Sequence, residues 1–416
     1  MTNTRSLALK AGLIAAAIAL LAPSSAPCTL ALVSGRATAN GRPLMWKNRD
    51  TSATNNKLAF FKGPKYGFIA VVNAEDAAPA AEVWGGQNAA GFAIMNSQAD
   101  DLGDAAKKVD GGGNGAFMKL ALGECATIGD FESLLVREKG KWNVAANFGV
   151  IDAEGGACFF ETGRDSFVKF DARDPRVAPF GTIVRTNFAF TAPDLMRGGG
   201  FDRFERIGHL VEAARAQGRL DARFILRQAA RDLVHEKLHS NPLSRPLPDD
   251  PAAPLYVHTN DTINRNTSVS AMVFEGAPSR DRADLATMWV LLGQPVTGVA
   301  VPVWPASGGV PSVTAGPGTA PLNDAALAIA AYLYPDRRGR MFQYLDVTRL
   351  RTYGGDGVLP KLFRIEDRAL ERTAAKWAEW AAKKPAPAAM AEFQEALASE
   401  AYESMKKEFA DIVPRR

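Results

Sequence analysis

The feature that most limits what this chain can fold into is a succession of short, strand-like apolar runs separated by turn residues. The first two runs, residues 29–34 and 43–48, lie on either side of Asn40-Gly41. An Asn-Gly pair between two apolar runs is a strong β-hairpin signal. The chain is therefore expected to begin its fold with an antiparallel pair of strands.

Further strand-like and helical segments follow along the chain. Strand-like runs are expected at residues 66–73, 91–96, 147–152, 157–161, 166–171, 182–186, 268–275 and 286–292. Helical periodicity is expected at residues 115–139, 201–217 and 221–239. Strands, then helices, then strands again predict layered α+β structure with mainly antiparallel sheets.

A stretch rich in Pro, Gly and Ser, residues 295–321, precedes a C-terminal part of different composition. Helical periodicity recurs there at residues 324–333, 362–383 and 390–412. We therefore expect three parts: a signal peptide or propeptide at residues 1–27, a catalytic domain at residues 28–310 and a helical C-terminal extension at residues 311–416.

The N-terminal segment has the layout of a secretory signal. Arg5 and Lys10 precede an apolar run at residues 11–22, which is followed by small residues ending at Ala26. The run is too short to span a bilayer. The sequence therefore predicts export to a bacterial periplasm or secretion, with no stable membrane insertion.

Composition and charge favour a globular enzyme of ordinary type. The 416 residues are 47% hydrophobic and 23% charged, which argues against disorder. The formal net charge of +4 falls by two, to +2, when the signal with Arg5 and Lys10 is removed. Such a near-neutral chain gives no reason to expect nucleic acid as a partner.

The chain has three cysteines, so at least one has no intramolecular disulfide partner in an oxidising compartment. Cys125 and Cys158 either pair with each other or are two small buried residues. Cys28 stands at the end of the signal and at the head of the first expected strand. Folding the chain about the Asn-Gly turn places residue 28 roughly opposite residue 53, and so returns Asp50 to the neighbourhood of Cys28.

Cleavage directly before Cys28 would place a thiol and a free α-amino group on one residue. Their ordinary pKa values are about 8.5 for a thiol and about 7.7–8.0 for an α-amine, so the neutral amine can accept the thiol proton near neutral pH. One residue then supplies both nucleophile and base. Such a site also needs hydrogen-bond donors for the oxyanion and a group that orients the amine.

Several motifs in fixed order resemble those of N-terminal nucleophile (Ntn) hydrolases, in the branch of choloylglycine hydrolase, penicillin V acylase and isopenicillin-N acyltransferase. The resemblance spans roughly residues 28–300, and the ordered set is more specific than any one motif. The motifs are Cys28-Thr29, Lys47-Asn48-Arg49-Asp50, Asn88-Ala89-Ala90-Gly91-Phe92 with Asn96, Arg185-Thr186-Asn187, and Asp202-Arg203-Phe204-Glu205-Arg206.

The resemblance implies a four-layer αββα sandwich and cleavage or transfer of an amide-linked acyl group from a small N-acyl substrate. It implies that Cys28 is the nucleophile and that Asp50 orients its amine or thiol. Asn96 would donate to the oxyanion, Asn187 would bind the reacting amide, and Arg203 would brace the site by pairing with Asp50 or the cysteine. No cofactor or metal is implied, and a homo-oligomer is left open.

The chain departs from several bile-salt hydrolases at one motif position. Those enzymes have Arg three residues before the Asp, where this chain has Lys47. Lysine cannot make the same planar bidentate contact. The departure weakens the expectation that this chain shares bile-salt specificity more than the expectation that it shares the mechanism.

Two alternative functions compete with this interpretation. The first is a lipid-anchored, non-catalytic envelope protein with the lipid on Cys28, but Pro27 is a poor match because such signals favour a small residue there. The second is a zinc-dependent hydrolase, because His235-Glu236-Lys237-Leu238-His239 matches H-E-x-x-H, with His258 as a third ligand. Lys237 would place a cation beside that metal, and Asn241-Pro242 would end the helix just after His239.

Overall fold

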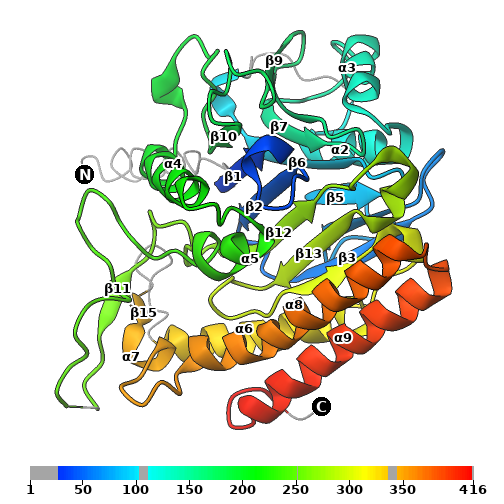
Figure 1. Ribbon diagram of the computed structural model, residues 1–416. Coiled ribbons are helices and arrows are strands. Elements are labelled where there is room, and N and C mark those ends of the chain that lie inside the picture. The colour runs from blue at the N-terminus through cyan, green and yellow to red at the C-terminus, as the bar shows by residue number, and fades with distance from the viewer. Residues whose placement is uncertain (1–26, 103–110, 251, 336–343, 415–416) are drawn as a thin grey trace, which may run out of the picture.

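Two antiparallel β-sheets form the centre of the protein, and helices lie against both of them (Figure 1). The computed structural model describes residues 27–102, 111–250, 252–335 and 344–414. The six-stranded sheet has the strand order β10-β1-β2-β12-β13-β14. Its strands are β1 Cys28–Val33, β2 Leu44–Asp50, β10 Thr182–Arg185, β12 Ser268–Glu275, β13 Thr287–Leu292 and β14 Val301–Val303.

The seven-stranded sheet follows the chain in order from β3 to β9. Its strands are β3 Asn56–Phe61, β4 Phe68–Asn73, β5 Gly85–Asn88, β6 Ala93–Gln98, β7 Ala146–Ile151, β8 Ala157–Thr162 and β9 Phe167–Asp171. A separate two-stranded ribbon pairs β11 Tyr256–His258 with β15 Tyr344–Asp346. The α-helices are α2 Asn114–Glu124, α3 Ile128–Arg137, α4 Phe201–Ala216, α5 Ala222–Phe224, α6 Pro321–Leu333, α7 Val347–Leu350, α8 Val358–Ala382 and α9 Pro387–Glu408.

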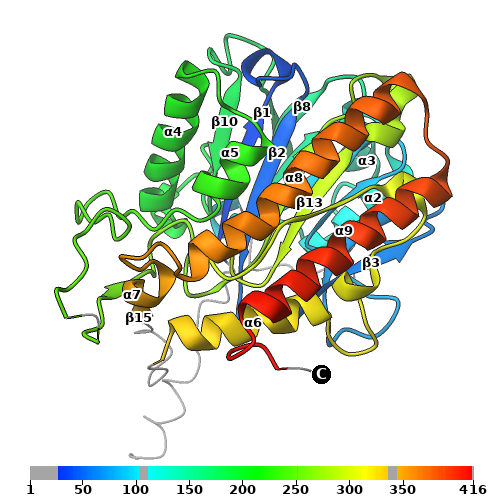
Figure 2. The ribbon, with the colours of Figure 1, turned by 60° about the horizontal axis from the view of Figure 1, so that its bottom comes forward.

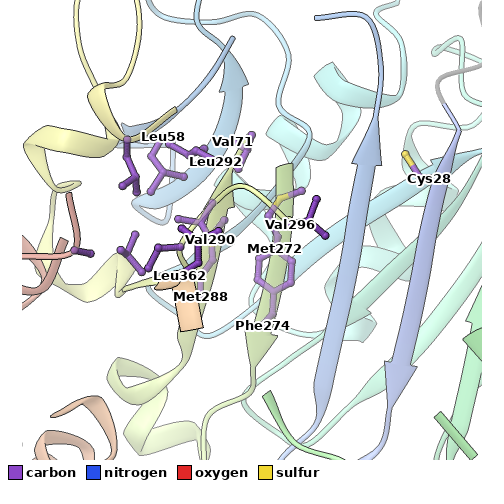
Figure 3. Close-up of a cluster of buried hydrophobic side chains, with 14 of the residues drawn as sticks. Cys28, Leu58, Val71, Met272, Phe274, Met288, Val290, Leu292, Val296 and Leu362 are labelled. Carbon is purple, nitrogen blue, oxygen red and sulfur yellow. The ribbon is translucent and has the colours of Figure 1, made fainter. Parts of the chain in front are cut away.

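Three hydrophobic clusters separate the layers. The first lies between the sheets and includes Met272 and Leu292 from the six-stranded sheet and Val71 from the seven-stranded sheet (Figure 3). The second packs the other face of the seven-stranded sheet, including Phe148, against α2 and α3. The third packs the other face of the six-stranded sheet, including Trp46, against α4, α5 and α8. The expected αββα arrangement is confirmed by this order of layers.

The C-terminal helices belong to the same packed structure as the sheets. Residues of α6, α8 and α9, such as Leu362, join the cluster between the sheets. Helices α8 and α9 lie side by side along one edge of the molecule (Figure 2). A helical C-terminal region is therefore present, whereas the division at residue 310 stays a prediction. Within the described residues, no helix combines the length and apolar composition needed to cross a membrane.

The first hairpin has a different turn from the one expected. Cys28 pairs with Arg49 rather than lying opposite residue 53, and Val33 pairs with Leu44. The connection is the whole of residues 34–43, which contains a 3-10 turn at Gly35–Ala37, rather than a two-residue Asn-Gly turn. The register therefore places Asp50 one position beyond the residue that faces Cys28.

The helix expected at residues 221–239 is much shorter. It consists of α5 and a π-helical turn, Ile225–Ala229. The carboxylate of Asp232 then accepts a hydrogen bond from the backbone N–H of Val234 at 3.1 Å and two from Arg206. A side chain that bonds nearby backbone in this way competes with the helix, which explains why the helix ends.

Five strands were not expected from the sequence, namely β3, β5, β11, β14 and β15, and the structure explains two of them. β5 is Gly-Gly-Gln-Asn and has no apolar alternation; at Gly86 a side chain would collide with the carbonyl of Ile69 on β4. β14 lies inside the Pro-rich stretch expected to be a connection. Pro302 cannot donate to a sheet, and β14 is accordingly the edge strand.

Cys125 and Cys158 are free and buried in the cluster between the seven-stranded sheet and its helices. Burial raises the pKa of each thiol to about 12. Of the two alternatives considered for this pair, the structure shows two small buried residues. Neither thiol has the thiolate character that nucleophilic chemistry requires.

A buried ion pair connects α8 to the segment that follows the π-helical turn. Glu366 is fully buried and accepts two hydrogen bonds from Arg231, at 3.0 and 2.8 Å, and one from the backbone N–H of Ala300 at 2.8 Å. Removing one partner of such a pair leaves an uncompensated buried charge.

Glu366→Ala is expected to lower the free energy of unfolding by about 3–5 kcal/mol because Arg231 would lose its counter-ion. The matched control is Glu400→Ala, which removes the exposed partner of Arg372 and is expected to change stability by less than about 1 kcal/mol. Denaturant unfolding of the two variants measures the difference. Equal losses would contradict a role for the buried pair in holding α8.

Candidate active site

Cys28 lies at the first position of β1 and is 4% exposed. Figure 3 shows it at the end of its strand, beside the apolar cluster between the sheets. It lines a pocket of about 400 Å³, together with Lys47 and Arg49 from β2, Asn96 from β6 and Trp84 from the segment before β5. Both sheets therefore contribute side chains around the cysteine.

The backbone nitrogen of Cys28 is held by a side chain that follows β10. Its N–H donates to Asn187 Oδ1 at 2.8 Å, and Asn187 Nδ2 donates to the carbonyl of Gln98 at 2.9 Å. Asn187 is kept in place by paired backbone hydrogen bonds with Gly199. The amide of Asn187 thus holds the nitrogen of Cys28 and links it to the end of β6.

Arg203, in the first turn of α4, completes this arrangement. One terminal nitrogen donates to the carbonyl of Cys28 at 2.5 Å and to the hydroxyl of Thr29 at 2.9 Å, and the other donates to Asn187 Oδ1 at 2.9 Å. Burial lowers the pKa of Arg203 to about 10, while the charge of Asp50 opposes this change. The guanidinium therefore joins the cysteine backbone to the side chain that holds its nitrogen.

Gly200 makes the position of Arg203 possible. It directly precedes α4 and has φ = 83°, in the left-handed region that favours glycine. A Cβ atom built on Gly200 would collide with the guanidinium of Arg203. Glycine is required here both for the backbone turn and for the close approach of the arginine.

Lys47 fixes the orientation of Asn96. Its ammonium donates to Asn96 Oδ1 at 2.8 Å and to the carbonyl of Trp84 at 2.7 Å. An ammonium has donors only, so the amide atom that faces it must be the oxygen, and Nδ2 of Asn96 is the end that can donate. Burial lowers the pKa of Lys47 to about 8, opposed chiefly by the neighbouring Cys28.

Arg49 is the cross-strand neighbour of Cys28. Its guanidinium lies over the ring of Trp84, 4.5 Å from the ring centroid, and donates to Asn56 Oδ1 at 2.5 Å and to Asn73 Oδ1 at 2.8 Å. Burial lowers the pKa of Arg49 to about 10. Two cationic side chains therefore line the pocket beside the cysteine.

Asp50 ends β2 and is fully buried. Its Oδ1 accepts from the hydroxyl of Ser268 at 2.6 Å, and Arg265 lies 3.7 Å from Oδ2. Burial raises the pKa of Asp50, while the charges of Arg265 and Arg203 oppose this rise. Strand alternation turns its side chain away from the face that carries Lys47 and Arg49. Asp50 therefore acts on Cys28 indirectly: its charge interacts with Arg203, and Arg203 donates to the carbonyl of Cys28.

The structure gathers the five expected site residues at one end of the sandwich, although Asp50 and Asn187 have hydrogen-bond partners other than those expected. Arg203 bonds the backbone of Cys28, one of the two alternatives for its partner, and Asn187 bonds the nitrogen of Cys28. Their catalytic roles stay predictions. Sequence reasoning missed three residues of the site: Arg265, Ser268 and Arg49. Ser268 begins β12 and Arg265 lies three residues before it, and neither belongs to a motif. Arg49 was recognisable only once its register with Cys28 was known.

The H-E-x-x-H motif has no helical geometry. His235 and His239 lie beyond the π-helical turn, His239 has φ = 46°, and the backbone of His235 pairs with that of Ser240. The carboxylate of Glu236 bonds Arg206 and His209 instead. Throughout the described ranges, no three His, Cys, Asp or Glu side chains are grouped so that they could hold a metal ion. The helix expected to include both histidines, at residues 221–239, ends before either of them.

Comparison with known proteins gives similarity to solved structures alone. No family model and no curated protein matches the chain. Penicillin V acylase from Agrobacterium tumefaciens is 14% identical over 67% of this chain and 86% of its own, with a TM-score of 0.38. A mutant of conjugated bile acid hydrolase from Clostridium perfringens is 11% identical over 67% of this chain and 92% of its own, with a TM-score of 0.41.

A third similar structure is the Caenorhabditis elegans ortholog of N-acylethanolamine-hydrolyzing acid amidase. It is 16% identical over 64% of this chain and all of its own, with a TM-score of 0.38. Penicillin V acylase and bile acid hydrolase are enzymes of the kinds that the ordered sequence motifs resemble. Because one fold hosts many chemistries, the functional assignment rests on the geometry around Cys28.

Proposed function

We propose that this protein is an exported cysteine Ntn amidohydrolase or acyltransferase that acts on an amide-linked acyl group through a thioester on Cys28. The main support for the proposal is the position of Cys28. The nitrogen of Cys28 is held by Asn187 and its carbonyl by Arg203, while the same residue lines a pocket shared with Asn96. Nucleophile, base and oxyanion donor would then meet at one point.

The reaction begins with proton transfer within Cys28. The neutral α-amine takes the thiol proton, and the sulfur attacks the carbonyl carbon of the substrate amide. The carbonyl π electrons move to oxygen, and Asn96 Nδ2 donates to the resulting oxyanion. The intermediate collapses with cleavage of the C–N bond, and the ammonium of Cys28 returns its proton to the leaving amine.

The thioester is resolved by a second nucleophile. Water gives hydrolysis and an amine gives acyl transfer; in each case the α-amine of Cys28 takes the proton of the attacking group and returns it to the departing thiolate. Asn187 and Arg203 act as positioning residues, because they hold the backbone of Cys28. Asp50 supplies a buried carboxylate that interacts with both Arg203 and Arg265.

The base exists only after the chain is cut before Cys28. In the described chain Pro27 still precedes Cys28, so the nitrogen is an amide and has no basic lone pair. Self-cleavage, or trimming after an upstream cut, would convert this nitrogen into an amine at the position where Asn187 already holds it. The export signal expected at residues 1–27 lies outside the described residues except for Pro27, and periplasmic or secreted localisation is part of the proposal.

The active protein is expected to begin at Cys28, because the amine is the general base. Intact mass and N-terminal sequencing check this, and a lipid adduct on Cys28 would instead support the anchored, non-catalytic alternative.

Cys28→Ala is expected to lose amide turnover by at least about 10³-fold. Cys125→Ala, which removes a buried thiol outside the pocket, serves as the control. An active protein that retains residues before Cys28 would refute the mechanism.

The rate is expected to fall above about pH 8 as Lys47 loses the proton that fixes Asn96. Lys47→Arg, whose guanidinium stays charged, should remove this alkaline decline from the pH profile of kcat/KM. Lys47→Met should lower kcat about 10²-fold at every pH, as loss of an oriented oxyanion donor does. An unchanged alkaline limb in Lys47→Arg would contradict this role of the lysine.

The lowered pKa of Lys47 also makes the free energy of unfolding depend on pH. Because burial lowers the pKa of Lys47 from 10.5 to about 8, the unfolded chain binds more protons than the folded one between these values. The contribution of Lys47 to the free energy of unfolding should therefore rise with pH from about 8 to 10.5. Subtracting the profile of Lys47→Met from that of the unmodified protein isolates this contribution.

A further inference from the structure

We propose that Asn147 is a positioning residue of the active site: its side-chain amide fixes Asn187, and through Asn187 it fixes the nitrogen of Cys28. The inference rests on the proposed function, in which that nitrogen becomes the general base. Asn147 lies on β7, belongs to none of the ordered sequence motifs and does not line the Cys28 pocket.

Asn187 lies beyond the end of β10, so it is not part of a strand ladder. β10 ends at Arg185, and the backbone of Asn187 forms an isolated bridge with Gly199. Buried irregular backbone needs hydrogen-bond partners from side chains or water. Residues 186–191, which we call the Asn187 segment, obtain these partners from the seven-stranded sheet.

The partners include a polar row on three neighbouring strands. Ser97 on β6 pairs with Asn147 on β7, and Asn147 pairs in turn with Glu161 on β8. All three are buried, at 1% exposure or less. Met95 and Phe159, two positions before Ser97 and Glu161, join the cluster between the sheets, so strand alternation directs the row toward the six-stranded sheet. Such buried polar groups are costly unless they are hydrogen-bonded.

The amide of Asn147 holds the peptide groups on both sides of Asn187. Its Nδ2 donates to the carbonyl of Thr186 at 3.3 Å and to that of Phe188 at 3.0 Å. The hydroxyl of Ser97 lies 3.1 Å from the same nitrogen and itself donates to the carbonyl of Thr186. Two carbonyls face this atom, so it must be the amide nitrogen, whose two hydrogens are shared among three acceptors. The backbone directly before and after the site residue is therefore fixed by one side chain.

Glu161 holds the far end of the Asn187 segment independently. It accepts from the backbone N–H groups of Phe190 at 3.0 Å and Thr191 at 2.9 Å, and Arg185 lies 2.9 Å away as its buried counter-ion. Loss of the Asn147 amide should therefore free the peptides next to the site residue without releasing the whole segment.

Two steps connect Asn147 to the chemistry. Asn187 Oδ1 accepts from the nitrogen of Cys28 at 2.8 Å. In protein that begins at Cys28 this nitrogen is an α-amine, and an acceptor held beside it favours the protonated form. The ammonium in turn stabilises the neighbouring thiolate. Displacement of Asn187 should therefore raise the pKa of the Cys28 thiol and leave less thiolate near neutral pH.

Alkylation of Cys28 by iodoacetamide tests this effect without a substrate, because the thiolate is the form that reacts. In protein that begins at Cys28, alkylation near neutral pH should slow at least about 5-fold in Asn187→Ala and at least about 3-fold in Asn147→Ala. The rate at high pH, where the thiol is fully ionised, should stay unchanged, which separates a shift of pKa from a change of access. Mass spectrometry of the Cys28 peptide measures the rates.

The double variant decides whether Asn147 acts through Asn187. Alkylation in Asn147→Ala/Asn187→Ala should be no slower than in Asn187→Ala, because residues that act in one network do not have additive effects. Additive losses would overturn the proposal and leave Asn147 a structural residue.

Gln394→Ala is the matched control. Gln394 on α9 is buried at 2% exposure, and its amide bonds the backbone of Trp304 and Gly309 at 3.0 Å in each case, outside the Cys28 pocket. Its loss should lower the free energy of unfolding and leave the pKa of the Cys28 thiol unchanged. A rise of this pKa equal to that in Asn147→Ala would show general loosening and would overturn the proposal.

Ser97→Ala is a milder variant that keeps the proposal testable if Asn147→Ala does not fold. It removes the hydroxyl that donates to the carbonyl of Thr186 and keeps the Asn147 amide. Alkylation near neutral pH should slow about 2-fold, and this loss should disappear in the Asn187→Ala background. A loss of the same size in both backgrounds would contradict the proposal.

Amide turnover separates this inference from the proposed function. Cleavage of N-butyryl-p-nitroanilide in the same variants should show a lower kcat with little change of KM in Asn147→Ala, and no further loss in the double variant. If the unmodified protein cleaves no amide, non-additive alkylation would still support the inference. Cleavage by the unmodified protein with additive losses in the double variant would leave the proposed function in place and overturn the inference.

Discussion

The antiparallel pairing of β1 with β2 is the interaction on which the rest of the site depends. It sets Cys28 opposite Arg49 and, by strand alternation, directs Lys47 and Arg49 to one face and Asp50 to the other. A shift of one residue in this register would exchange the two faces. The long connection at residues 34–43 does not determine the register by turn type. The buried side chains on both faces of the strands do so instead, because a shift would bring charged groups into the apolar clusters.

Most of the architecture could be predicted from sequence because it follows from local patterns. The helices α3, α4, α8 and α9 have apolar periodicity, and most strands alternate or are continuously apolar between turns. Some of the failures came where tertiary contacts overrode local preference. β5 is held by close backbone packing that its glycines permit, and β14 depends on the edge of a sheet that accepts Pro302. At Asp232, side-chain hydrogen bonds ended a helix that the periodicity favoured.

The candidate site was partly predictable for a similar reason. Asn187 and Arg203 could be proposed as site residues because they belong to motifs whose order can be read from the sequence alone. Arg265 could not, because its relation to Asp50 exists only across the β2–β12 pair. The H-E-x-x-H motif was a false match. The motif requires both histidines on one face of a helix, but the backbone at His239 lies in the left-handed region.

Asn187 and Arg203 form hydrogen bonds with the backbone of Cys28 while Pro27 is still attached. Proline has no N–H to contribute to a sheet, and Pro27 stands just outside the first strand. In the proposed mechanism, cutting the bond after it therefore alters no pair in the β1 ladder. Maturation would be a chemical event beside an already formed β1 ladder: a neutral amide nitrogen becomes a titratable amine, and the mature enzyme gains a base that the precursor lacks.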